Sequence, residues 1–146
     1  MDKVISWTTL ISNLCVIAGI VFLGFELRQN SEVAAATIRQ EIAHTDLTVA
    51  LSVATNPEVA DYLARANNGE PLSPRQETQL RSLTYATHRR MENVYHQYQA
   101  GMLSEEQWAG YLRNLSLVHN RPAMRNHYRA NSYSESFQKL LLDIEE

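Results

Sequence analysis

Three side chains in the segment 74–100 have the types and the spacing of metal ligands. His88, Glu92 and His96 stand four residues apart, so a helix would place them on one face. Imidazole and carboxylate groups at this spacing form metal sites in helical bundles, where several helices contribute ligands. The chain has no HExxH or CxxC motif, and partner carboxylates are not evident. We therefore expect a polar face turned to solvent or to a partner, with metal binding as the alternative.

Polar residues also interrupt the apolar pattern of this segment. Glu92-Asn93 is followed by Gln97-Tyr98, close to apolar positions of the same expected helix. Because buried polar groups in proteins are hydrogen-bonded, we interpret these residues as a network that fixes how the helix packs. The alternative interpretation is a ligand site built from the same residues.

Three arginines recur every four residues near the C-terminus, at Arg121, Arg125 and Arg129. On one helical face they would hold an anion or a lipid headgroup, because guanidinium groups bind phosphate and carboxylate oxygens in pairs. The other interpretation, which we favour, is a solvated face whose arginines pair with the acidic residues at the end of the chain.

Nucleophilic catalysis finds no support in the sequence. The single cysteine, Cys15, lies in a long apolar stretch, and no GxSxG motif or glycine-rich phosphate loop occurs. The net charge of −3 is not that of a nucleic-acid-binding protein. We therefore predict a protein without enzymatic activity, cofactor or nucleic-acid partner.

The apolar segment from Val4 to Phe25 dominates the organisation of the chain. It has 22 residues and no charged side chain. As a helix it would be roughly 33 Å long, enough to cross a bilayer core of about 30 Å. This predicts a transmembrane anchor over residues 1–27. A cleaved signal peptide and a buried helix of a soluble protein are the alternatives, although only three residues precede the apolar run.

Small and polar residues recur along the predicted anchor, at Ser12, Asn13, Cys15 and Gly19. Small side chains let two helices approach closely, and an amide such as that of Asn13 needs a hydrogen-bond partner inside a membrane. We therefore predict that these four residues form an oligomer interface in the membrane. The alternatives are an Asn13 bonded to its own backbone and a pore lined by Asn13, Thr9 and Ser6.

The remainder, residues 28–146, is predicted to be a helical soluble domain, which makes the chain all-α. Glycine and proline are scarce, with five and four copies. The first helix has no clear stop before Ala54, with Asn30-Ser31 as the alternative end. The apolar stripe of its second half needs a cover, either from later helices or from a second copy of the chain.

Local signals divide this domain into the helices of a C-terminal bundle. Asn56-Pro57 and capping boxes at Ser73–Gln76 and Ser104–Gln107 mark three helix starts. Gly101 is placed to end the helix that starts at Pro74. A short helix is expected over residues 122–130, and a last helix turns Phe137, Leu140, Leu141 and Ile144 inward.

Several motifs in this order are familiar. They are FELRQN (25–30), NPEVA (56–60), LSP (72–74) and ENxYxQY (92–98). The chain resembles an uncharacterised family of small bacterial membrane proteins with one N-terminal transmembrane helix and a helical soluble domain. The resemblance implies a bacterial membrane, which we expect to be the inner membrane, and it implies neither catalytic residues nor a mechanism.

We expect a single-pass membrane protein that contacts membrane lipid and acts by association, as a homo-oligomer or as an accessory subunit of a larger membrane complex. Lys3 lies before the span, whereas Arg28 and Arg39 follow it, which favours a cytoplasmic C-terminal domain. The alternatives are an oligomeric channel or pore and a ligand or metal-binding sensor that uses the polar face of the helix 74–100.

Overall fold

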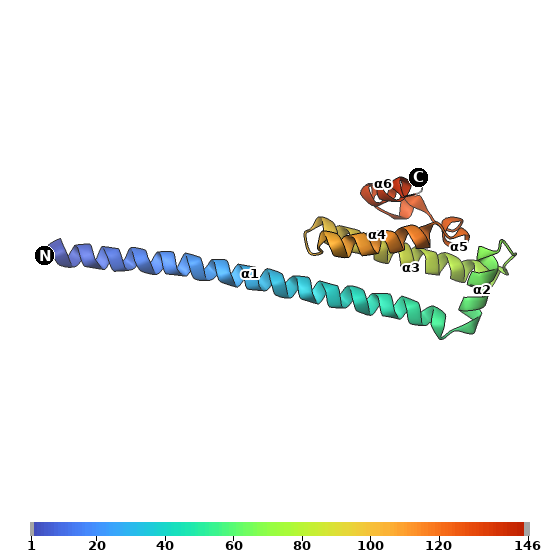
Figure 1. Ribbon diagram of the computed structural model, residues 1–146, viewed down its shortest axis with the longest axis horizontal. Helices are drawn as coiled ribbons and strands as arrows, with labels where there is room; N and C mark the ends of the chain where they lie inside the picture. Colours follow the sequence, from blue (N-terminus) through green and yellow to red (C-terminus); the bar gives the residue numbers. More distant parts are fainter. Residues whose placement is uncertain (1, 145–146) are drawn as a thin grey trace. The chain divides into compact units, whose positions relative to one another are not determined.

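A computed structural model describes residues 2–144, and Trp7 is the one described side chain before Leu10. Within these residues the chain is helical and has no strand, which confirms the all-α prediction (Figure 1). The elements are α1 (Asp2–Ala54), α2 (Pro57–Asn67), α3 (Pro74–Gln99), α4 (Glu105–His119), α5 (Pro122–Arg125), a 3-10 turn η1 (Ala130–Ser132) and α6 (Glu135–Asp143).

The chain divides into two compact units. We call Met1–Thr37 the N-terminal unit and Ile38–Glu146 the C-terminal unit. Helix α1 continues without a break from one into the other, so the predicted alternative end at Asn30-Ser31 is wrong. The Ser31 hydroxyl donates to the Leu27 carbonyl oxygen at 3.0 Å, which satisfies the side chain within the helix.

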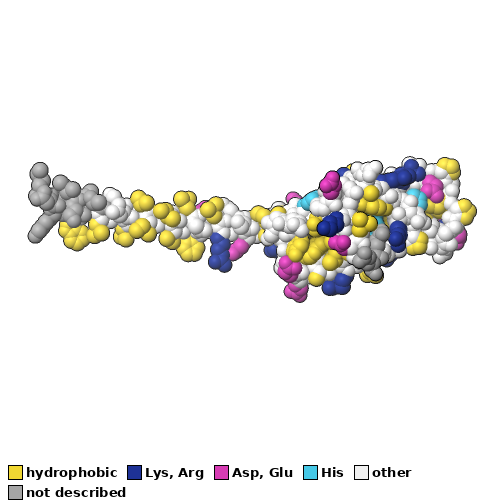
Figure 2. All heavy atoms as spheres, turned by 90° about the horizontal axis from the view of Figure 1, so that it is seen from above, with side chains coloured by type: hydrophobic (Ala, Val, Ile, Leu, Met, Phe, Trp, Pro, Cys, Tyr) yellow, Lys and Arg dark blue, Asp and Glu magenta, His cyan; other side chains and the backbone are white. Residues whose placement is uncertain are grey.

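Among the described residues, the N-terminal unit is formed by α1 alone. Its side chains from Leu10 to Phe25 are all exposed. An 18-residue window of this helix has a mean hydropathy of 2.1, and none of the window is buried. By length and composition the helix could therefore span a membrane. Figure 2 shows hydrophobic side chains along this unit on the visible face.

The predicted helix starts are confirmed, because side chains accept the unpaired N–H groups of the first turns. The Asn56 carboxamide oxygen accepts two backbone N–H groups of α2. Ser73 with Gln76 and Ser104 with Gln107 form complete capping boxes at α3 and α4. Local side-chain contacts thus fix the starts of α2, α3 and α4.

Gly101 ends α3 as predicted. Its φ of +74° is left-handed, a conformation that glycine adopts at little cost. The backbone N–H of Gly101 donates to the Tyr98 carbonyl oxygen at 2.9 Å, and that of Met102 donates to Gln97 at 3.0 Å. These are the two bonds of a Schellman motif, which stop the helix and let α4 run back along α3 (Figure 1).

Helix α3 is central to the core of the C-terminal unit. Its Leu80, Met91 and Val94 each belong to a different cluster of buried side chains. Ile42 of α1 is buried in the same cluster as Val94 and Trp108. Later helices of the same chain therefore cover this part of α1, which is one of the two covers that we predicted for its apolar stripe.

The last helix also packs as predicted. Phe137 and Leu141 of α6 are fully or almost fully buried, and they cluster with Met91 of α3 and Leu115 of α4. Leu140 and Ile144 are half-buried against the same cluster. Helices α3 and α4 thus contribute to two buried clusters, one of which also contains a residue of α1 and the other residues of α6.

Candidate functional site

His88 lies inside the core rather than on a polar surface. Its side chain is 1% exposed. Its Nδ1 lies 2.9 Å from the Thr84 carbonyl oxygen, and its Nε2 lies 3.0 Å from Nδ1 of His119 on α4. A carbonyl only accepts, so His88 donates from Nδ1 and accepts from His119 at Nε2. Both ring nitrogens of His88 are therefore engaged.

Burial keeps His88 neutral well below pH 7. It lowers the pKa of His88 to about 4, and the nearby His119 contributes to the lowering, whereas the bond to the Thr84 carbonyl opposes it. Aromatic rings complete the surroundings, with the centroids of Tyr128 and Tyr133 at 5.1 and 6.0 Å from that of the imidazole. The histidine pair is thus a hydrogen-bonded part of an aromatic core.

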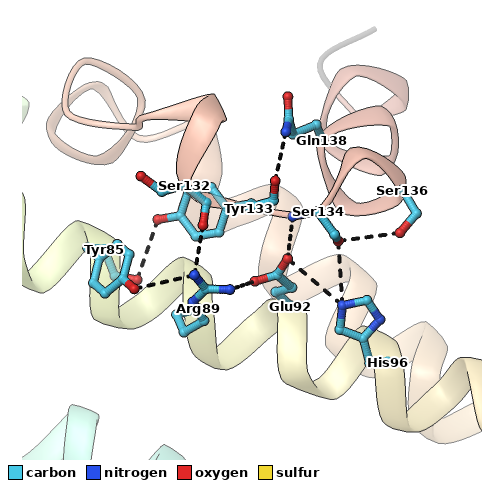
Figure 3. A network of polar contacts seen from close by, with 9 residues as sticks. All are labelled: Tyr85, Arg89, Glu92, His96, Ser132, Tyr133, Ser134, Ser136 and Gln138. Carbon is cyan, nitrogen blue, oxygen red and sulfur yellow. Dashed lines mark hydrogen bonds and ion pairs between the residues drawn. The ribbon is translucent and has the colours of Figure 1, made fainter.

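Glu92 forms a buried polar network one turn further along α3 (Figure 3). Its side chain is 3% exposed. One carboxylate oxygen accepts the backbone N–H of Ser134 at 2.6 Å, and the other accepts from the Arg89 guanidinium at 2.5 Å. Arg89 also donates to the Ser132 carbonyl oxygen at 2.8 Å. We call Glu92, Arg89, Ser132 and Ser134 the α3–α6 latch, because they bind the segment before α6 to α3.

The latch holds Glu92 in its charged form. Burial alone would raise the pKa of Glu92, but the hydrogen bonds from Ser134 and the charge of Arg89 outweigh it and hold the pKa below its usual value. The Arg89 guanidinium lies 5.5 Å from the ring centroids of both Tyr85 and Tyr133, a cation–π arrangement. This arrangement stabilises a fixed ion pair and does not prepare a carboxyl group for proton transfer.

The three predicted metal candidates have different surroundings. His88 is bonded within the core, Glu92 is bonded to the latch, and His96 is half-exposed with its Nε2 3.9 Å from the Glu92 carboxylate. Among residues 2–144, no three or more His, Cys, Asp or Glu side chains are grouped as metal ligands would be. Glu92 does belong to a buried hydrogen-bond network of the kind that we predicted for this helix.

The three arginines near the C-terminus do not share a helical face. Helix α5 ends at Arg125, which makes it shorter than predicted, and Arg121 is its N-cap. Arg129 has an extended backbone, with φ −123° and ψ 95°. Arg121 and Arg129 line two different cavities. The argument from helical spacing for one shared anion site therefore does not apply, and anion binding by these arginines stays a prediction.

The residues of the predicted oligomer interface are on the surface of the N-terminal unit. Their side chains, where they have one, are exposed, and among the described residues a Cβ built at Gly19 meets nothing within 4 Å beyond the adjoining backbone of its own helix. The members are Ser12, Asn13, Cys15 and Gly19. Ser6 and Thr9, the other residues of the pore alternative, have side chains outside the described residues. The interface and the pore both stay predictions.

Sequence reasoning missed the partners of the two buried polar residues on α3. His119 does carry a signal, because it continues the apolar spacing of Trp108, Leu112 and Leu115 along α4. Ser134 carries none, since it contributes a backbone N–H that any residue except proline has. Comparison of the chain with protein-family models, curated proteins and solved structures found no match.

Proposed function

We propose that this chain is a single-pass membrane protein that acts by association, either with further copies of itself or as an accessory subunit of a membrane complex. The observation that carries the proposal is the run of exposed apolar side chains from Leu10 to Phe25. Such a surface in water would cost about 25 cal/mol for each Å² of apolar area. Lipid tails cover it without help from the rest of the chain.

Association is supported by the chemistry of Asn13. Its exposed side chain lies on the apolar helix, where lipid offers no hydrogen-bond partner. A second helix approaching over the small residues Cys15 and Gly19 would supply that partner. The C-terminal unit has its own buried core and remains available for contacts in water.

We place the protein in a bacterial inner membrane, with membrane lipid as its first partner and the C-terminal unit in the cytoplasm. The sequence resemblance supports the bacterial membrane. Arg28 and Arg39 support the orientation, because basic residues gather on the cytoplasmic side of a span. Fusion of a periplasm-dependent reporter enzyme to the C-terminus tests the orientation, and an active reporter would contradict it.

Cys15 offers a direct test of the anchor, because it is the single cysteine. In intact membranes we expect a hydrophilic maleimide to leave Cys15 unlabelled and to label it after denaturation in SDS. The matched control is the N114C variant in a Cys15→Ser background, since Asn114 is exposed on α4 of the C-terminal unit. The comparison uses vesicles that are open to the reagent but whose bilayer is not dissolved. Equal labelling rates for Cys15 and for the control in these vesicles would refute the span.

The mass of the particle in lipid nanodiscs tests association. We expect a defined oligomer or a defined complex, and we expect Asn13→Leu to shift the wild-type particle towards the single chain. Leu14→Ile, at the neighbouring exposed position, is the control that keeps the helix apolar. A wild-type chain that is strictly monomeric and copurifies with nothing would refute association and leave the anchor standing.

A further inference from the structure

A cavity of about 320 Å³ lies inside the C-terminal unit, between the end of α1 and helices α2 to α5. Its volume is at the lower end of the range of about 300–1,000 Å³ that is typical of small-molecule sites. Most of its lining is apolar, with Val49 of α1, Leu63 of α2 and Met124 of α5 on different sides. The walls suit a short hydrocarbon chain.

Two of the polar side chains that line this cavity, Thr87 and Arg90, belong to α3. Thr87 is 5% exposed, and Arg90 has a side chain that is 10% exposed. Both line the cavity. Within the described chain, residues 2–144, the Thr87 hydroxyl and Nε of Arg90 are buried and have no hydrogen-bond partner. Native proteins rarely leave such donors unpaired, so these two groups indicate that something else binds them.

The spacing of Thr87 and Arg90 lets one ligand group reach both. They are three residues apart on α3, and residues at this spacing lie next to each other on one helical face. The Arg90 Nε–H can only donate, and the Thr87 hydroxyl can donate as well as accept, so an acceptor satisfies both groups. A carboxylate has two oxygens and accepts from two donors at once.

The charges around the cavity favour an anion. Arg90 forms an ion pair with Asp46 of α1, and Arg121 is a second arginine in the lining. Of the residues described, none in the lining is acidic. Two arginines and Asp46 together leave one excess positive charge, which matches a ligand with one negative charge.

We propose that this cavity binds a monocarboxylate with a short apolar chain, in the manner of a medium-chain fatty acid. Its carboxylate accepts from the Thr87 hydroxyl and from Nε of Arg90, and its chain lies between Val49, Leu63 and Met124. This function goes beyond membrane anchoring and association, since it uses residues of the C-terminal unit alone. It makes that unit a receptor for a small amphiphilic anion.

The test uses the full chain in lipid nanodiscs and hexanoate as the probe, followed by isothermal titration with empty nanodiscs subtracted. We expect saturable binding of hexanoate at one site per chain. Hexylammonium and acetate should not bind, because the first reverses the charge and the second lacks the apolar chain.

Variants on α3 make the test specific. Thr87→Val removes the hydroxyl at nearly constant volume and should weaken hexanoate binding about tenfold, whereas Thr87→Ser keeps the hydroxyl and should restore it. Thr78→Val is the control, because Thr78 is an exposed threonine of the same helix that does not line the cavity. Ala50→Leu should fill the cavity and abolish binding.

Three results would overturn the proposal. The first is no saturable heat of binding up to about 10 mM hexanoate, above the affinity range of fragments of this size, which would mean that water alone pairs with the two donors. The second is equal binding of hexylammonium. The third is an equal loss with Thr87→Val and Thr78→Val in chains whose circular dichroism matches the wild type.

Discussion

Acidification from pH 7 to pH 5 should destabilise the C-terminal unit by about 2 kcal/mol through His88. The pKa of His88 is about 4 in the folded chain, against an ordinary value of 6.5. Because the folded pKa is the lower one, the unfolded state binds more protons between these values, so stability falls as the pH falls through 6.5. Each pKa unit corresponds to about 1.36 kcal/mol, which gives roughly 2 kcal/mol at pH 5 and about 3.4 kcal/mol once the pH is below 4.

Urea unfolding followed by tryptophan fluorescence measures this effect. Trp108 is buried and stacks on Tyr98 with ring centroids 4.9 Å apart, so its emission reports the loss of the core. A Trp7→Phe background removes the second tryptophan. With a slope of about 2 kcal/mol per molar urea, the midpoint should fall by about 1 M between pH 7 and pH 5.

The variant His88→Gln separates this residue from the other titrating groups. It should be less stable than the wild type at pH 7, because it loses a ring that fits between His119 and Tyr128. Its loss of stability between pH 7 and pH 5 should be smaller by about 2 kcal/mol. His44→Gln, which changes an exposed histidine of α1, is the control and should retain the loss of stability that His88 causes. If His88→Gln keeps the full pH dependence, the reasoning about the buried imidazole is wrong.

Two further predictions concern the latch and the end of α3. Glu92→Gln should lower the free energy of unfolding by about 1–3 kcal/mol in the same assay, because it removes the charge that pairs with Arg89. The control is Glu41→Gln, which changes an exposed glutamate of α1. An equal effect of the two substitutions would contradict the role of the latch. Gly101→Ala should cost about 1–2 kcal/mol at a φ of +74°, whereas Gly110→Ala inside α4 should be neutral or stabilising. Thermal unfolding compares the two glycine variants, and a stable Gly101→Ala would show that the left-handed turn is not required.

The helix boundaries were predictable from the sequence because the signals for them are local. Asn56, Ser73 and Ser104 each bond to backbone groups within three residues of themselves. Gly101 likewise acts on the turn that precedes it. Such contacts depend little on the rest of the fold, so the residues next to a helix end are enough to predict it.

The buried polar contacts were not predictable in the same way. His88 meets a residue 31 positions away, and Glu92 meets one 42 positions away. These pairs depend on how α3, α4 and α6 pack, which periodicity alone does not fix. The shortened α5 has a similar cause, since Tyr128 leaves the helical path and stacks on Tyr133 at 5.2 Å. Tertiary packing there overrides a helical pattern that the sequence carries.

The neighbouring residues Arg89 and Arg90 of α3 contact different parts of the C-terminal unit. Successive residues of a helix point about 100° apart, so Arg89 reaches Glu92 in the latch while Arg90 reaches Asp46 of α1. Each arginine therefore binds a different part of the unit to the same helix. The two faces differ in one respect: the latch bonds both oxygens of its carboxylate, whereas beside Arg90 the Thr87 hydroxyl and the Arg90 Nε are buried without a partner among residues 2–144. A complete network stabilises a fold and requires no ligand, so it is the incomplete face of α3 that points to binding.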